Sequence, residues 1–317
     1  MKRLRVLTIF LMCLPVALVA RNPVNTLWQH TVLCAIDSFP VNGGYYTGCK
    51  PNAKFAKTTW QGLKDAFKMG EDDERPTFDP WQAQPSFCSS ATYAVLVKAL
   101  LMWDRQGQIS RQAWENMRVH DGQDDGVGFW GRANANGPAL AVLVNEIGAG
   151  YSFAAYRGAK NDSVKETPCE RYMTDAEWRA HPVWFSARPG DVMKIFWNRN
   201  DSRGHDGGAI VGEDGVRGHL QEAGHSVIFL GLDAEGKVHY WSSNGPGKEP
   251  EKMGYGEGCC DKVAIQRVVF TRILKPEAFD HVRNMAPSDV NQYLHDLNGK
   301  RHSDSKELER MIGARNP

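Results

Sequence analysis

The chain has 317 residues and a formal net charge of +1, with 42% hydrophobic residues and ten tryptophans. That length allows one large domain with extensions or two small ones, and the apolar content is ample for a core. The nearly balanced charge gives no case for nucleic-acid binding.

The N-terminus predicts a secretory signal peptide over residues 1–20. Three basic residues, the last of them Arg5, precede an uncharged run from Val6 to Ala20. This is the layout of a cleavable leader, and the run is too short for a good membrane span. Without the leader the chain holds 35 basic and 37 acidic residues, a formal charge of −2. We therefore expect a secreted or periplasmic protein without stable membrane insertion.

Six cysteines remain after the leader. An oxidising compartment favours disulfides, although a sequence alone cannot fix their connectivity. The pairing that we expect is Cys34 with Cys49, and Cys169 with Cys259 or Cys260. Cys88 then stays unpaired within a helical pattern, and one further cysteine is left over.

The chain divides into three parts after the leader. Residues 21–80 are rich in Gly, Lys, Asp and Pro and are interpreted as an N-terminal extension. Residues 81–275 carry the periodic patterns of a folded domain, and residues 276–317 form a charged, partly helical tail. No internal repeat is present.

Helical patterns dominate the first half of the domain. A helix is predicted from about Ser89 to Asp104, with apolar residues on nearly every side, so it should be buried. "GPALAVLVNEIGAG" begins with Pro138 and stops near Gly148, which is typical helix punctuation. A polar helix is expected near "TDAEWRAH".

The second half changes to strands: "RPGDVMKIFW", two strands in "GHSVIFLGLDAEGKVHYWSSN", and "VAIQRVVFTRI". The segments "GHDGG" and "GYGEGCC" are interpreted as glycine-rich loops near the site. Helices followed by a mostly antiparallel sheet indicate an α+β domain, with a buried helix packed against that sheet.

The predicted hairpin places a histidine opposite an asparagine. If residues 233–236 form a four-residue loop, Leu232 pairs with Lys237 and His225 lies opposite Asn244. Directly opposed residues have Cβ atoms roughly 4.5–5.5 Å apart and point to the same face. The asparagine amide would then hold the imidazole by one ring nitrogen.

The partner of His225 depends on this register. A three-residue loop or a β-bulge would replace Asn244 by Ser243 or Gly245. A histidine held by one nitrogen has the other free to accept a proton from a thiol. Cys88 stands at the start of the predicted helix, where unpaired N–H groups lower a thiol pKa below its usual value of about 8.5. These residues together favour a thiol nucleophile with a histidine base.

The order Cys88, His225, Asn244 resembles that of the papain-like cysteine peptidase superfamily, including the exported NlpC-type cell-wall hydrolases. The resemblance spans about 81–273, and the 137 residues from Cys88 to His225 fit the roughly 130–150 of papain-type enzymes. "RPGDVMKIFW" is similar to the Pro-Gly-Asp strand that precedes the histidine strand in NlpC-type hydrolases.

The resemblance implies a papain-like fold and a fourth site residue. A glutamine six residues before the cysteine helps to form the oxyanion hole in this superfamily, and Gln82 occupies that place, with Gln84 as a rival. The implied activity is an exported cysteine hydrolase that cleaves amide bonds through a thioacyl intermediate. By the same resemblance the substrate is peptidoglycan peptide, and no cofactor is needed.

Other interpretations stay open at this point. The chemistry also suits a protein-directed protease or an acyltransferase, and a non-catalytic papain-like binding module would use Cys88 only for packing. His205, Asp206, His219 and His225 are close in the sequence and suggest zinc. Because there is no His-x-x-x-His on a helix and no Cys-x-x-Cys, we expect no metal.

Overall fold

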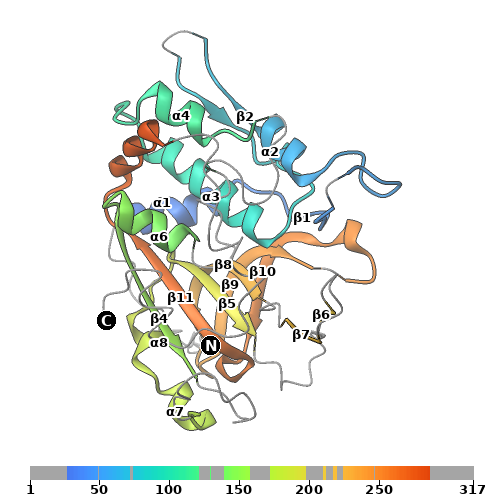
Figure 1. Ribbon diagram of the computed structural model, residues 1–317, viewed down its shortest axis with the longest axis vertical. Coiled ribbons are helices and arrows are strands. Elements are labelled where there is room, and N and C mark those ends of the chain that lie inside the picture. The colour runs from blue at the N-terminus through green and yellow to red at the C-terminus, as the bar shows by residue number, and fades with distance from the viewer. Residues whose placement is uncertain are drawn as a thin grey trace, which may run out of the picture.

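The fold is α+β, as the sequence predicts, with a mostly antiparallel sheet and helices around it (Figure 1). The computed structural model describes residues 27–48, 50–71, 74–120, 129, 139–157, 172–197, 210–211, 217–219, 224–245 and 247–285.

The main sheet has seven strands in the order β1-β10-β9-β8-β5-β11-β4, and all its neighbouring strands are antiparallel. Its strands are β1 (Asn42–Gly43), β4 (Gly150–Tyr156), β5 (Val192–Trp197), β8 (Gly224–Leu232), β9 (Val238–Asn244), β10 (Gly254–Cys260) and β11 (Ile265–Ile273). Two small antiparallel pairs lie outside it: β2 (Phe67–Lys68) with β3 (Thr77–Phe78), and β6 (Ile210–Val211) with β7 (Arg217–His219).

The described α-helices are α1 (Leu27–Ile36), α2 (Thr59–Ala66), α3 (Cys88–Trp103), α4 (Arg111–Met117), α6 (Ala139–Glu146), α7 (Asp175–Arg179) and α8 (Pro182–Ser186). Short 3-10 helices are η1 (Pro250–Lys252), η2 (Lys262–Ala264) and η3 (Pro276–Asn284). The three predicted helices are confirmed as α3, α6 and α7, and the predicted strands as β5, β8, β9 and β11.

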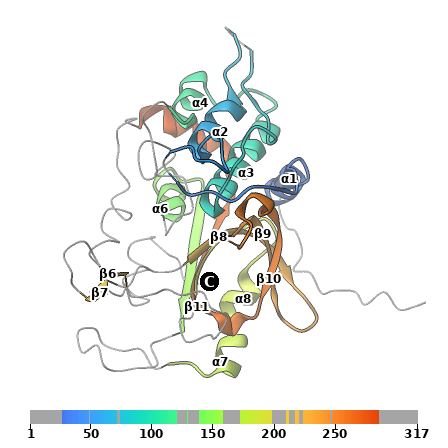
Figure 2. The same ribbon diagram turned by 90° about the vertical axis from the view of Figure 1, so that its right-hand side faces the viewer.

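Apolar side chains cover both faces of the sheet. On one face, α1 and α3 pack with Ile228 and Trp241 of β8 and β9, while Trp178 and Trp184 pack with Phe229 on the other. Figure 2 shows α2, α3 and α4 at one end of the molecule and α7 at the opposite end. Helix α3 is thus packed between α1 and strands β8 and β9.

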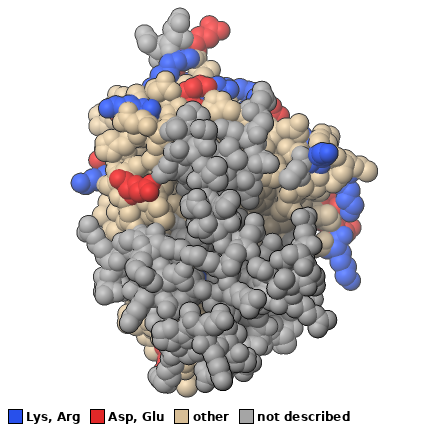
Figure 3. Space-filling view, viewed as in Figure 1, with Lys and Arg blue, Asp and Glu red and all other residues tan. Residues whose placement is uncertain are grey.

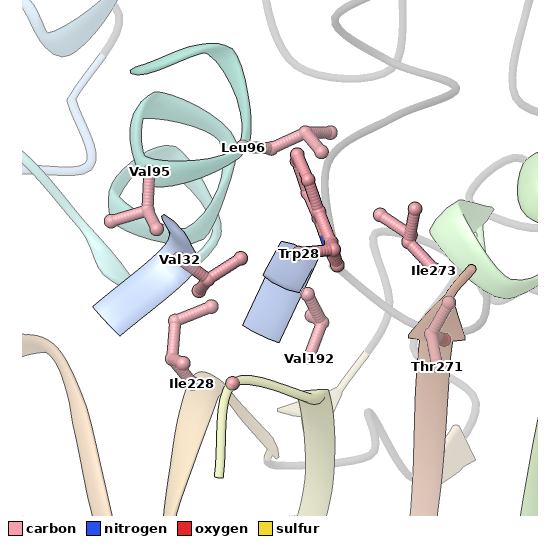
Figure 4. Close-up of a pocket in the computed structure, with 9 residues that line it drawn as sticks. Trp28, Val32, Val95, Leu96, Val192, Ile228, Thr271 and Ile273 are labelled. Atoms are coloured by element: carbon pink, nitrogen blue, oxygen red, sulfur yellow. The ribbon is translucent and has the colours of Figure 1, made fainter. Parts of the chain in front are cut away.

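A small apolar cavity lies between α1, α3 and the sheet (Figure 4). Its volume is about 10 Å³, which is room for about one water. Its lining consists mainly of apolar side chains, among them Trp28, Leu96 and Ile228. The cavity is a packing gap in the core and too small for a ligand.

The β8–β9 turn differs from the expected one. Leu232 pairs with Val238, so the loop has five residues, 233–237, and the predicted pairing of Leu232 with Lys237 is wrong. The Asp233 carboxylate accepts a hydrogen bond of 2.8 Å from the Lys237 N–H. That side-chain contact stabilises a turn that is one residue longer than the predicted one.

A β-bulge at Leu230 compensates for the longer loop. Beyond it, Phe229 pairs with Tyr240, which is the register that the four-residue loop predicts. The same register places His225 opposite Asn244. A bulge adds one residue to one strand only, so it cancels the extra residue in the turn.

The segment "GYGEGCC" is the strand β10, so its interpretation as a loop is wrong. Its glycines serve close packing: a Cβ at Gly258 would lie 2.6 Å from the Tyr240 ring, and one at Gly254 would lie 2.1 Å from the Asn42 carbonyl oxygen. Because glycine is unfavourable in most strands, the local pattern suggests a loop. Pairing with β9 and β1 overrides it.

The segment before residue 81 contributes directly to this core. α1 and α2 pack in the same apolar cluster as α3, and β1 pairs with β10 at the sheet edge. Strand β4, which pairs with β11, and helix α4 were not predicted from the sequence. The C-terminal part of the described chain ends with η3, against which α4 packs.

Several predicted features lie outside the described residues. They are the signal peptide, His205, Asp206, Cys49, Cys169, the "GHDGG" segment and the tail after residue 285. Within the described ranges, Cys34, Cys88 and Cys259 carry free thiols, and no cluster of three or more potential metal ligands occurs. None of the described helices is both long and apolar enough to cross a bilayer.

Candidate active site formed by Cys88, His225 and Asn244

Cys88 is the first residue of α3 and is half-buried. The Ser90 hydroxyl accepts a hydrogen bond from the Phe87 N–H at 2.8 Å and donates one to the Phe87 carbonyl at 2.7 Å, which fixes the first turn. The first N–H groups of a helix have no partner within it. Cys88 therefore lies where backbone donors and the helix dipole favour negative charge.

His225 and Asn244 are joined by a hydrogen bond of 3.0 Å between Nε2 and Oδ1. The Asn244 Nδ2 donates to the Gly256 carbonyl at 2.9 Å, which turns Oδ1 toward the imidazole. An amide oxygen only accepts, so Nε2 carries the proton and Nδ1 is left to interact with a thiol. The predicted pairing of His225 with Asn244 is confirmed in this contact.

Two aromatic rings hold the imidazole in place. Trp197 is stacked beside His225 with ring centroids 6.3 Å apart, and the Tyr240 ring lies nearly perpendicular to the imidazole with centroids 5.4 Å apart. Only 8% of His225 is exposed. Packing against the two aromatic rings thus restricts the plane of the imidazole. The hydrogen bond to Asn244 sets the direction in which Nε2 points.

Cys88 and His225 are in direct side-chain contact. Burial raises the pKa of the Cys88 thiol, but the hydrogen bond and the charge of His225 outweigh it, helped by Lys194 and the Ser226 N–H; the pKa falls to about 6. Thiolate is the nucleophilic form of cysteine. The group is therefore largely ionised at neutral pH.

Ser243, the alternative partner of His225, has another role. Its Oγ accepts a hydrogen bond of 2.8 Å from the Ser86 hydroxyl. Ser86 lies two residues before the nucleophile, so this contact joins the start of α3 to β9. It sets the distance between the helix that carries Cys88 and the strand that carries Asn244.

Tyr45 is a further residue of the candidate site, and it could not be predicted from the sequence. Its hydroxyl hydrogen-bonds Cys88, and burial, the charge of Cys88 and that bond all raise the pKa of Tyr45. The phenol therefore stays protonated and donates to the sulfur. No local pattern marks Tyr45, because it reaches the nucleophile across 43 residues of sequence.

The backbone around Tyr45 is tightly held. The Tyr45 N–H donates to the Pro250 carbonyl at 2.8 Å, and the Ser86 N–H donates to the Gly44 carbonyl at 3.0 Å. A Cβ at Gly245 would lie 2.4 Å from Cγ of the Tyr45 ring. The glycine beside Asn244 thus makes room for the ring over the site.

The two glutamines lie in the turn before α3. Gln82 is exposed, and its backbone carbonyl accepts a hydrogen bond of 3.4 Å from Lys57. The Gln84 side chain packs over Gly43, where a Cβ would lie 2.4 Å from Oε1. No described contact joins the Gln82 side chain to Cys88, and its oxyanion role stays a prediction.

No family model, curated protein or solved structure matches the chain. The residues of the site themselves indicate its chemistry. The site combines a nucleophile, a base in contact with it, a group that orients the base, and donors beside the sulfur, which is what acyl transfer requires.

Proposed function

We propose that the protein is an exported cysteine hydrolase of papain-like type that cleaves amide bonds. The observation that carries this proposal is the Nε2–Oδ1 bond of 3.0 Å between His225 and Asn244, which directs the other ring nitrogen to Cys88. A cysteine that served only for packing would need no oriented histidine beside it. A histidine with a purely structural role would need no thiol in contact with it.

In the first half-reaction the Cys88 thiolate attacks the carbonyl carbon of the substrate amide. The carbon–oxygen π electrons move to oxygen and give a tetrahedral oxyanion. When the oxyanion collapses, the C–N bond breaks, and the His225 imidazolium gives its Nδ1 proton to the departing amine. The products of this step are a free amine and a thioester on Cys88.

In the second half-reaction water attacks the thioester carbon and His225 takes one of its protons. Collapse of the second oxyanion breaks the C–S bond, which releases a carboxylic acid and regenerates the thiolate with the imidazolium. Asn244 keeps the ring oriented through both steps, because its Oδ1 accepts from the Nε2–H throughout.

Two donors are suited to the oxyanion: the Cys88 N–H at the start of α3 and the Tyr45 hydroxyl. Removal of one such donor typically costs about 10²–10³ in kcat. We expect Tyr45→Phe to reduce kcat by about 10² and Gln82→Ala to change it little. Steady-state assays of both variants compare the two candidates, and the reverse ranking would give the role to Gln82.

Peptidoglycan peptide is the favoured substrate, through the resemblance to cell-wall hydrolases. The test incubates the purified protein with muropeptides and identifies the new amine and carboxylate ends by mass spectrometry. An added amine that appears in the product would identify an acyltransferase. Cleavage of proteins but not of muropeptides would favour the protease alternative.

Thiol reactivity tests the proposal without a known substrate. Iodoacetamide should modify Cys88 rapidly at pH 7 and faster than Cys34 and Cys259, as read by peptide mass spectrometry, because Cys88 is a thiolate there. Slow modification of Cys88, at the rate of an ordinary thiol, would instead identify the non-catalytic binding module.

A further inference from the structure

We propose that Lys194 is a positioning residue whose charge holds Cys88 as a thiolate, in addition to the action of His225. The inference rests on the proposed function, because it concerns the same nucleophile. Lys194 does not touch the reacting atoms in this scheme. It acts through the electrostatic potential at the sulfur.

Lys194 lies on β5, two residues after Val192, which packs in the same apolar cluster as α3. On β5 it is directly opposed to Ser226 of β8 and Val269 of β11, so the three residues share one face. The Ser226 N–H hydrogen-bonds the Cys88 sulfur. The lysine is therefore the cross-strand neighbour of a residue that already contacts the nucleophile.

The ammonium group is directed toward the beginning of β8. Its Nζ lies 3.0 Å from the position that a Cβ would take at Gly224, which immediately precedes His225. A side chain at Gly224 would displace this group. Glycine there allows the cation to approach the backbone beside the catalytic histidine.

Lys194 is only 5% exposed. Solvent screens a buried charge far less than a surface charge, and an ammonium is costly to bury unless negative charge lies near it. The thiolate of Cys88 supplies such a charge, and the attraction lowers the thiol pKa. The lysine thus helps to keep the anion stable before substrate arrives.

The other charged and titratable groups in the described surroundings act differently. His225 and Tyr45 both hydrogen-bond the sulfur itself. Arg267 of β11 shares the Phe196 ring with Lys194: its guanidinium carbon lies 5.2 Å from the ring centroid and the Lys194 Nζ lies 5.6 Å from it. Besides His225, Lys194 is the group among the described residues whose positive charge lowers the Cys88 pKa.

The experiment measures the rate of iodoacetamide modification of Cys88 from pH 4.5 to 9 in the full chain, read by peptide mass spectrometry. Lys194→Met keeps the length of the side chain and removes the charge. We expect its Cys88 titration to shift upward by about one pH unit, with about fivefold slower modification at pH 6. Lys194→Arg should keep the charge and titrate close to the parent protein.

Lys262→Met is the matched control, because Lys262 is also 5% exposed and its Nζ donates to the Arg179 carbonyl at 3.1 Å, in the η2–α7 region. It should leave the Cys88 titration unchanged. If Lys194→Met does not fold, as judged by circular dichroism, Lys194→Gln replaces it in the same measurement.

Three outcomes overturn the inference: an unshifted titration in the folded, uncharged variant, an equal shift in Lys194→Arg, or an equal shift in Lys262→Met. The parent protein separates this failure from that of the proposed function. A parent Cys88 that titrates as an ordinary thiol refutes the hydrolase, whereas a parent value near 6 that Lys194→Met does not move refutes only the role of Lys194.

Discussion

Two buried polar clusters lie at opposite ends of the paired strands β5 and β8. One consists of Cys88, His225 and Asn244, the residues of the proposed active site, and we call it the catalytic cluster. The other surrounds Asp191, which directly precedes β5, and we call Asp191, Arg272 and Gln29 the anchor cluster. Both put charge into the interior, and in the catalytic cluster the half-buried residue Cys88 is the group that we propose to react.

In the anchor cluster both carboxylate oxygens of Asp191 accept hydrogen bonds. Arg272 donates to Asp191 from Nη2 at 2.6 Å and from Nε at 3.0 Å, and Gln29 and the Arg188 N–H add bonds of 2.9 and 2.8 Å. Burial raises the pKa of Asp191, and Arg272 opposes this effect. The cluster joins α1, β5 and β11 without any group available for chemistry.

The difference shows how one sheet supports both stability and reactivity. The predicted Pro-Gly-Asp turn belongs to the anchor cluster, since Asp191 orders the entry to β5 rather than touching the nucleophile. Lys194 lies three residues further along and belongs to the catalytic end. A few residues of one strand thus separate a structural role from an electrostatic one.

The largest expected effect falls on activity alone. Cys88→Ala should reduce kcat by about four orders of magnitude or more, because no nucleophile remains. The melting temperature should stay within a few degrees, since the change removes only the sulfur of a half-buried residue. His225→Ala provides a comparison with a similar loss. Turnover that survives Cys88→Ala would place the chemistry elsewhere.

The next effect falls on stability alone. Asp191→Ala leaves Arg272 buried without its carboxylate and should lower the free energy of unfolding by about 3–5 kcal/mol. Denaturant unfolding measures it, and the specific activity of the folded fraction should be kept. Glu251→Ala, which removes a surface pair with Lys54, is the control and should not change the midpoint. A stable Asp191→Ala protein would contradict the comparison.

An intermediate effect tests orientation at the catalytic end. Asn244→Ala should lower kcat by about 10², because the imidazole stays but loses the group that orients it. Ser243→Ala, which breaks the bond to Ser86, should be much milder. The defects of Asn244→Ala and His225→Ala should not add in the double variant. Additive losses would mean that the two residues act separately.

The smallest effect is a pH dependence. The Cys88 pKa is lowered to about 6, so the thiolate is present above that pH and is lost as the pH falls through it. A plot of kcat/KM against pH should therefore have an acid limb near 6. An acid limb above pH 8 would show that the sulfur is not activated in the free protein.

The regular elements could be predicted where the periodicity is strong. α3 and strands β5, β8, β9 and β11 follow from apolar runs with clear ends. β10 could not, because its glycines are explained only by the neighbouring Tyr240 ring and β1 backbone. Lys194 could not either, since a lysine within a strand usually indicates the solvent face, and its burial depends on tertiary packing.

The His225–Asn244 pairing was predicted although the turn was not. The predicted loop is one residue too short, and the bulge at Leu230 was not foreseen. The two errors cancel, because each shifts the opposed pairs by one residue in opposite directions. The contact of Tyr45 with Cys88 could not be predicted in this way, since nothing in the local sequence relates the two residues.

The position of Tyr45 has a consequence for how the protein matures. The nucleophile needs Tyr45 from the early part of the chain and His225 and Asn244 from the late part, and Asn244 itself depends on Gly256 in β10. Before folding is complete, Cys88 should therefore react as an ordinary thiol, and its higher reactivity should arise only when the last strands join the sheet. In urea, Cys88 should be modified no faster than Cys34, and its selective modification should return on refolding at the same rate as the native circular dichroism signal.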